Sequence, residues 1–129
     1  MADLKEKFNE LVNIQAFYQA WGRQILASLP QEKISEIENK LLEAQKDAEP
    51  YTAVDHSNFL KVLTDGPERN YENAVTLITK FLRHADYNLG ILMDNIPEQT
   101  AKDAAPKNAG ALNPLAQKYQ LPNLQRLTS

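Results

Sequence analysis

Hydrophobic residues recur with helical periodicity along most of the chain, and the clearest run extends from Tyr71 to Ile96. When this segment is projected at about 100° per residue, its apolar side chains fall within an arc of roughly 120°. Polar residues such as Glu72, Lys80 and Arg83 lie on the opposite side. The pattern predicts one amphipathic helix whose apolar stripe must be covered by other helices. The stripe comprises Tyr71, Ala74, Val75, Ile78, Phe81, Leu82, Ala85, Leu89, Leu92, Met93 and Ile96.

The first 29 residues contain a second helical pattern with a wider apolar arc, which spans roughly 200°. Its apolar positions are Leu4, Phe8, Leu11, Ile14, Phe17, Tyr18, Trp21, Ile25, Leu26 and Leu29. Two interpretations explain this width. The helix is either central in a bundle and contacted from two sides, or Phe17 and Trp21 face a second subunit or a partner. Gly22 costs a helix about 1 kcal/mol relative to Ala, so we expect it to let a neighbouring helix approach closely.

Proline and glycine separate these segments from two further predicted helices. Pro30 favours a helix start, and a narrow apolar seam predicts a helix from 30 to 48. The seam consists of Ile34, Ile37, Leu41, Ala44 and Ala48, with Leu42 outside it. Another helix is expected from Thr52 or Asp55 to Asp65, where Gly66-Pro67 gives a stop signal. Short links favour antiparallel neighbours, so residues 1–96 are predicted to be an all-α domain of two helical hairpins resembling a four-helix bundle.

Residues 97–129 form a proline-rich C-terminal arm that contains four of the seven prolines. Its formal charge is +2, whereas residues 1–96 carry −5. We expect a short helix at 98–105, a loop at 106–111, and another short helix from Asn113-Pro114 to about Gln120. Large apolar residues recur about every three positions at Leu112, Leu115, Tyr119, Leu121, Leu124 and Leu127. A disordered tail rarely holds so many, so the arm is expected to pack on the bundle, a second subunit or a partner.

Composition argues against several classes of function. The net charge of −3 and a pI near 5.4 do not favour binding to nucleic acid or to an anionic membrane. No window contains enough apolar residues to span a bilayer. The chain has no cysteine, which removes thiol chemistry and suits a reducing compartment, so a cytoplasmic location is expected.

Candidate catalytic and metal-binding residues are sparse. His56 and His84 lack the spacing of a di-metal helical bundle, because the residues three positions before them are Ala53 and Phe81. We expect His56 to be exposed and His84 to be half-buried at the edge of the apolar stripe. Asp86 and Asp94 also lie near this stripe and are interpreted as structural polar residues. The sequence therefore predicts no catalytic residue, no metal site and no cofactor.

These patterns favour a non-enzymatic interaction or assembly protein. Its partner would be another protein or a second copy of the chain, which would make it an oligomer. The residues expected to make that contact are Phe17, Trp21, Leu112, Leu115, Tyr119, Leu121, Leu124 and Leu127. The alternative is a helical bundle that binds a small apolar or aromatic ligand in a pocket lined by Phe17, Tyr18, Trp21 and Phe81.

Overall fold

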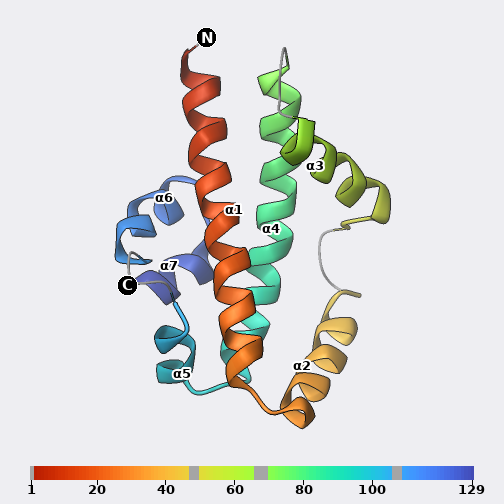
Figure 1. Cartoon of the computed structure of the whole chain (residues 1–129), viewed down its shortest axis with the longest axis vertical. Helices are drawn as coiled ribbons and strands as arrows, with labels where there is room; N and C mark the ends of the chain where they lie inside the picture. Colours follow the sequence, from red (N-terminus) through yellow and green to blue (C-terminus); the bar gives the residue numbers. More distant parts are fainter. Residues whose placement is uncertain (1, 47–49, 66–69, 106–108) are drawn as a thin grey trace.

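A computed structural model describes residues 2–46, 50–65, 70–105 and 109–129, and every element within these ranges is helical. The elements are α1 (Ala2–Ser28), α2 (Gln31–Ala44), α3 (Ala53–Asp65), α4 (Tyr71–Asp94), α5 (Glu98–Asp103), the 3₁₀ helix η1 (Ala109–Leu112), α6 (Asn113–Lys118) and α7 (Pro122–Thr128). The all-α class predicted from the sequence is confirmed. Figure 1 shows the arrangement of these helices.

The helix boundaries follow the local signals in the sequence. Asn70 caps α4, because its side-chain Oδ1 accepts a hydrogen bond from the backbone N–H of Asn73 at 2.9 Å. Pro30 precedes α2, and Pro122 occupies the first turn of α7, where its missing N–H leaves no hydrogen bond unmade. α2 ends at Ala44, which is earlier than predicted. The predictions for Ala48 and for the stop at Gly66-Pro67 lie outside the described residues, as does the part of the predicted loop at 106–108. The rest of that loop prediction is wrong, because residues 109–111 belong to η1.

The long helices α1 and α4 lie side by side and run in the same direction (Figure 1). Near their N-terminal ends, the rings of Phe8 and Tyr71 meet edge to face with centroids 5.9 Å apart. Further along both helices, the hydroxyl of Tyr18 donates a hydrogen bond to Asp86 Oδ1 at 2.8 Å. This parallel pair was not part of the predicted two hairpins. It is possible because the segment between residues 28 and 71 is long enough to bring the chain back to the end of the bundle at which α1 begins.

The shorter helices cover the α1–α4 pair from two sides. On one side, α2 and α3 pack against α4; on the other side lie α5, α6 and α7 (Figure 1). α2 runs antiparallel to α4, since Lys40 Nζ donates to Asn95 Oδ1 at 2.6 Å and Tyr87 donates to the Ala44 carbonyl at 3.0 Å. The helix α1 contacts α4 through Tyr18 and the C-terminal arm through Trp21, whose Nε1 donates to the Ala101 carbonyl at 2.9 Å. Contact from two sides was one of the two interpretations of its wide apolar arc.

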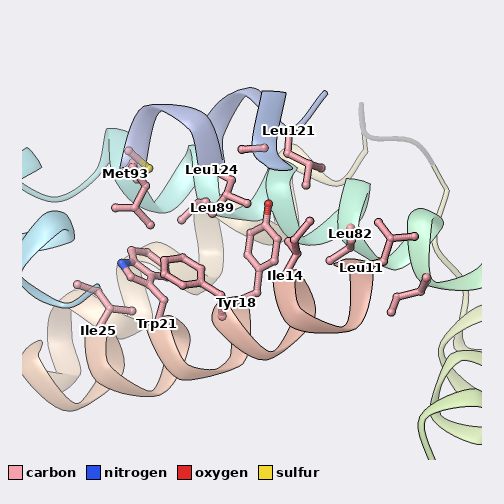
Figure 2. Packing of buried hydrophobic residues seen from close by; sticks show 14 of the residues in the cluster. Leu11, Ile14, Tyr18, Trp21, Ile25, Leu82, Leu89, Met93, Leu121 and Leu124 are labelled. Carbon is pink, nitrogen blue, oxygen red and sulfur yellow. The ribbon is translucent and has the colours of Figure 1, made fainter. Parts of the chain in front are cut away.

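The hydrophobic core lies between α1, α4 and α7. Leu11, Ile14 and Ile25 of α1 are fully buried, as are Leu82 of α4 and Leu124 of α7, at 1 % exposure or less. Figure 2 shows the side chains of Tyr18 and Ile14 pointing from α1 towards α4 and the C-terminal helix. Burial of each such side chain contributes roughly 1.5–3 kcal/mol before conformational entropy is counted, so this contact dominates the stability of the fold.

The C-terminal arm packs on the bundle through a buried carboxylate as well as through apolar contacts. Asp86 on α4 is 5 % exposed and accepts hydrogen bonds from the backbone N–H groups of Asn123 at 3.2 Å and Leu124 at 2.9 Å. It thus serves as the N-terminal cap of α7, although it lies on another helix. The close approach occurs at Gly90, where an added Cβ would come within 2.6 Å of the Asn123 side chain.

The expectation for Gly22 is wrong, because a Cβ built there meets no atom within 4 Å among the described residues. No neighbouring helix uses the space beside this glycine. Gly22 instead lies at the bottom of an open region between α1, α3 and α4, which is considered next.

Candidate ligand-binding cleft

A cleft of about 350 Å³ opens on the side of the molecule covered by α2 and α3. Its floor is formed by α1, through Tyr18 and Gly22, and by α4, through His84 and Asn88. Tyr51, which precedes α3, also lines it. The volume is at the lower end of the roughly 300–1,000 Å³ that small-molecule sites occupy. Within the described part of the chain, no residue lining this cleft carries a formal charge at neutral pH when its histidines are neutral.

The rings of Tyr51, His56, Phe81 and His84 give the cleft an aromatic wall. Tyr51 lies on His84 with ring centroids 4.5 Å apart and planes inclined by 15°. Phe81 of α4 also lines the cleft, and it stacks on Phe59 of α3 with centroids 4.1 Å apart and planes inclined by 12°; Phe59 itself is buried and does not line the cleft. His56 joins the two pairs, because its Nδ1 is 3.1 Å from the Tyr51 hydroxyl and its ring is 5.9 Å from that of Phe59. The wall therefore presents planar, weakly polar surfaces to an occupant.

A short capping motif positions Tyr51 and His56. The Thr52 N–H donates to Asp55 Oδ2 at 2.9 Å, and the Asp55 N–H donates to Thr52 Oγ1 at 3.1 Å. This reciprocal pair is a capping box, which fixes the direction in which the chain enters α3. Asp55 also forms an ion pair with Lys80 of α4 at 2.9 Å. The Thr52 backbone and Lys80 hydrogen bonds lower the pKa of Asp55 below its usual range.

His84 and Asn88 supply buried polar groups at the floor of the cleft. As placed, the Asn88 amide Nδ2 donates to His84 Nε2 at 3.3 Å. His84 Nδ1 and Asn88 Oδ1 are both buried and have no hydrogen-bond partner among the described residues. Burial lowers the pKa of His84, and the neighbouring His56 adds to this effect. The neutral form of the ring is therefore favoured at physiological pH.

Tyr18 contributes an apolar ring to the cleft, while its hydroxyl is committed elsewhere. The hydroxyl donates to Asp86, which lies between α4 and α7. Burial raises the pKa of Tyr18, and the Asp86 carboxylate raises it further. Tyr18 therefore stays a neutral hydrogen-bond donor and has no free acid–base function.

The structure brings together three of the four residues predicted to line an aromatic pocket. Tyr18, Trp21 and Phe81 line the cleft, whereas Phe17 does not. Phe17 is 5 % exposed and packs in the core.

The eight residues expected to contact a partner are covered by the chain itself to different extents. Phe17, Trp21, Leu121, Leu124 and Leu127 are buried. Leu112, Leu115 and Tyr119 are half-buried and pack against the core. The Trp21 indole also donates to the Ala101 carbonyl of α5 at 2.9 Å, which ties α1 to the arm. In this conformation these residues hold the arm on the bundle, so they do not form an exposed apolar surface.

The sequence analysis did not identify the importance of Tyr51 and Asn88. Tyr51 follows Pro50 in a segment without helical periodicity, so no local signal places it against α4. His84 and Asn88 are four residues apart on one helix, and this spacing does predict contact between their side chains. The sequence did not predict that this side of α4 faces an open cleft, because that depends on the positions of α2 and α3.

The side chains that line the cleft are aromatic, aliphatic or uncharged polar groups. Among the described residues, no group of three or more His, Cys, Asp or Glu side chains could hold a metal ion. The same part of the chain has no helix that is long and apolar enough to cross a membrane. The cleft instead offers ring faces, aliphatic surface and the polar pair of His84 and Asn88.

The chain was also compared with known proteins. No family model, no curated protein and no solved structure matches it.

Proposed function

We propose that this protein is a non-enzymatic binding protein whose aromatic cleft holds a small, largely apolar ligand. The observation that carries the proposal is a cleft of about 350 Å³ that is lined mainly by aromatic and aliphatic side chains, with His84 and Asn88 among its few polar residues. Apolar walls with a few polar groups are the usual composition of small-molecule sites. The cytoplasmic location expected from the sequence forms part of this proposal.

Gly22 allows this proposal to be tested without removing a core contact. Because a Cβ at Gly22 meets nothing within 4 Å, a larger side chain there extends into the cleft. The substitution Gly22→Leu also improves helix propensity, so it is expected to fill the cleft while keeping the fold. Gly22→Ala is the matched control, since a methyl group leaves most of the cleft free.

The neutral fluorescent probe N-phenyl-1-naphthylamine is suitable for the measurement. We expect the wild type and Gly22→Ala to enhance its emission saturably, and Gly22→Leu to weaken binding at least tenfold. Trp21 lines the cleft and is the only tryptophan in the chain, so its emission should change in the same titration. Absence of saturable binding to the wild type, or equal binding by Gly22→Leu, would contradict the proposal.

The partner-binding role expected from the sequence is supported by a different surface. A second groove, of about 320 Å³, lies between α1 and α2 and has aliphatic walls formed by Ile25, Leu26 and Ile37, among others. Leu26, which lines this groove, is 51 % exposed. We therefore propose, as the second candidate function, that a second copy of the chain associates here.

This candidate is tested through the mass of the protein in solution. Light scattering at increasing concentration should show a dimer for the wild type and a monomer for Leu26→Glu. Val54→Glu is the control, because Val54 is 68 % exposed but does not line the groove. A monomeric wild type at all concentrations would exclude the dimer.

A further inference from the structure

The aromatic cleft and the aliphatic groove between α1 and α2 adjoin each other. Both are lined by Gly22 of α1 and by Asn88 and Leu92 of α4. A Cβ built at Gly22 meets no atom within 4 Å, so α1 places no side chain at the point that the two spaces share. Together they offer nearly twice the volume of the cleft alone, since they measure about 350 and 320 Å³.

The order of the lining residues along α1 shows that the groove continues the cleft. Tyr18 lines the cleft, Gly22 lines both spaces, and Leu26 and Leu29 line the groove. Positions three or four apart lie on the same side of a helix, so these residues follow one another along one face. At 1.5 Å per residue, the groove extends about 10 Å from Gly22 to Leu29.

The two spaces differ in the chemistry of their walls. The cleft is lined by aromatic rings, among them Tyr51, Phe81 and His84, which suit a planar group. The groove has no aromatic side chain among its described lining residues, and its aliphatic side chains suit an alkyl chain. They are Ile25, Leu26, Leu29, Ile34, Ile37, Leu41 and Leu92.

The charges along both spaces favour an uncharged occupant. No described residue that lines the cleft is an Asp, Glu, Lys or Arg, and Glu38 is the one such residue lining the groove. An anionic ligand would lose hydration in the cleft without gaining a counter-charge, and it would be repelled by Glu38 in the groove.

We propose that the ligand of this protein is an elongated, uncharged molecule, with an aromatic head in the cleft and an alkyl chain of about eight carbons in the groove between α1 and α2. This inference rests on the first proposed function, because it names the ligand class of the same cleft. It gives the groove a different occupant from the second copy of the chain considered above.

Calorimetric titration with alkylphenols at pH 7.5 tests the inference. 4-Octylphenol and 4-butylphenol share an uncharged aromatic head and differ only in the length of the chain. Each buried methylene should tighten binding about threefold, so 4-octylphenol is expected to bind at least twentyfold more tightly than 4-butylphenol. 4-Octylbenzoate has the same chain on an anionic head and should bind at least tenfold more weakly than 4-octylphenol.

Substitutions at Leu26 separate the groove from the cleft, because Leu26 lines only the groove. Leu26→Glu should reduce 4-octylphenol to the affinity of 4-butylphenol and leave 4-butylphenol within threefold, which also shows that the variant is folded. Leu26→Trp fills the groove without adding charge and should cause the same selective loss. Leu42→Glu is the matched control, since Leu42 is 66 % exposed and does not line the groove.

The outcomes distinguish this inference from the proposed function. Equal affinity for the two phenols, undiminished 4-octylphenol binding by both Leu26 variants, or tightest binding of 4-octylbenzoate would overturn the ligand class even if N-phenyl-1-naphthylamine still binds in the cleft. A wild-type dimer that persists in saturating 4-octylphenol would also overturn it, because the groove would then hold a second copy. Failure of the phenols and N-phenyl-1-naphthylamine to bind would contradict the proposed function itself.

Discussion

The carboxylate of Asp86 on α4 caps the backbone of Leu124 on α7, with Oδ1 accepting the Leu124 N–H at 2.9 Å. The same oxygen accepts the hydroxyl of Tyr18 on α1 at 2.8 Å. One buried side chain thus joins the first helix, the central helix and the last helix. The arm is therefore part of the folded core, and its stability depends on this junction.

Replacing Asp86 should destabilise the protein strongly. Asp86→Asn removes the charge and one acceptor while the Tyr18 hydroxyl and two backbone N–H groups remain buried, so we expect a loss of about 3 kcal/mol in the free energy of unfolding. Urea denaturation measures this loss. The matched control is Asp94→Asn, which breaks only an exposed ion pair with Arg126 and should change stability by less than about 1 kcal/mol. Similar losses in both variants would show that burial of Asp86 is unimportant.

The two glycines in long helices should respond in opposite directions to the same substitution. Gly90→Ala forces the Asn123 side chain away from its hydrogen bond with the Asp86 carbonyl, so a loss of about 1–2 kcal/mol is expected. Gly22→Ala has open space and should gain about 0.5–1 kcal/mol through helix propensity. Thermal and urea unfolding of the two variants provide the comparison. A stabilised Gly90→Ala variant would contradict the close approach of α7.

The leucines of the arm should behave as core residues. Leu124 is fully buried, so Leu124→Ala should cost about 2–5 kcal/mol through lost burial and the resulting cavity. Leu42 is 66 % exposed, and Leu42→Ala should stay within about 0.5 kcal/mol of the wild type. If the arm were instead a detachable docking element, both substitutions would leave the unfolding free energy unchanged.

His84 should make stability depend on pH in a defined direction. Burial lowers its folded-state pKa below the ordinary value of 6.5, so the unfolded chain binds the proton more readily. The contribution of neutral His84 is fully present above about pH 6.5 and is lost as the pH falls towards the folded-state pKa. The melting temperature of the wild type should therefore decrease between pH 7.5 and 5.5, a window above the ordinary range of carboxylates.

The variant His84→Gln tests this assignment, because an uncharged amide does not titrate. Its melting temperature should decrease less over the same pH interval. An identical decrease in wild type and variant would assign the effect to other groups.

Local sequence signals predicted most of the helices, but not η1 or α7. The apolar stripe from Tyr71, the cap at Asn70 and the proline start at Pro30 each act within a few residues, so they can be recognised without knowledge of the fold. The helical content and the exposure of Leu42 were predicted on this basis. The candidate site was predicted only in part, because Tyr18, Trp21 and Phe81 were identified from apolar periodicity while Tyr51 and Asn88 were not.

By itself, the sequence determined which segments are helical and which side of each helix is apolar, because periodicity and capping are local properties. Only the tertiary structure decided that α1 and α4 are parallel, since apolar stripes have no preferred partner. It also decided that another helix approaches closely at Gly90 rather than at Gly22, and that the arm is anchored on Asp86. The cleft arises for the same reason: it lies between α1, α3 and α4, and its shape depends on packing that no single segment encodes.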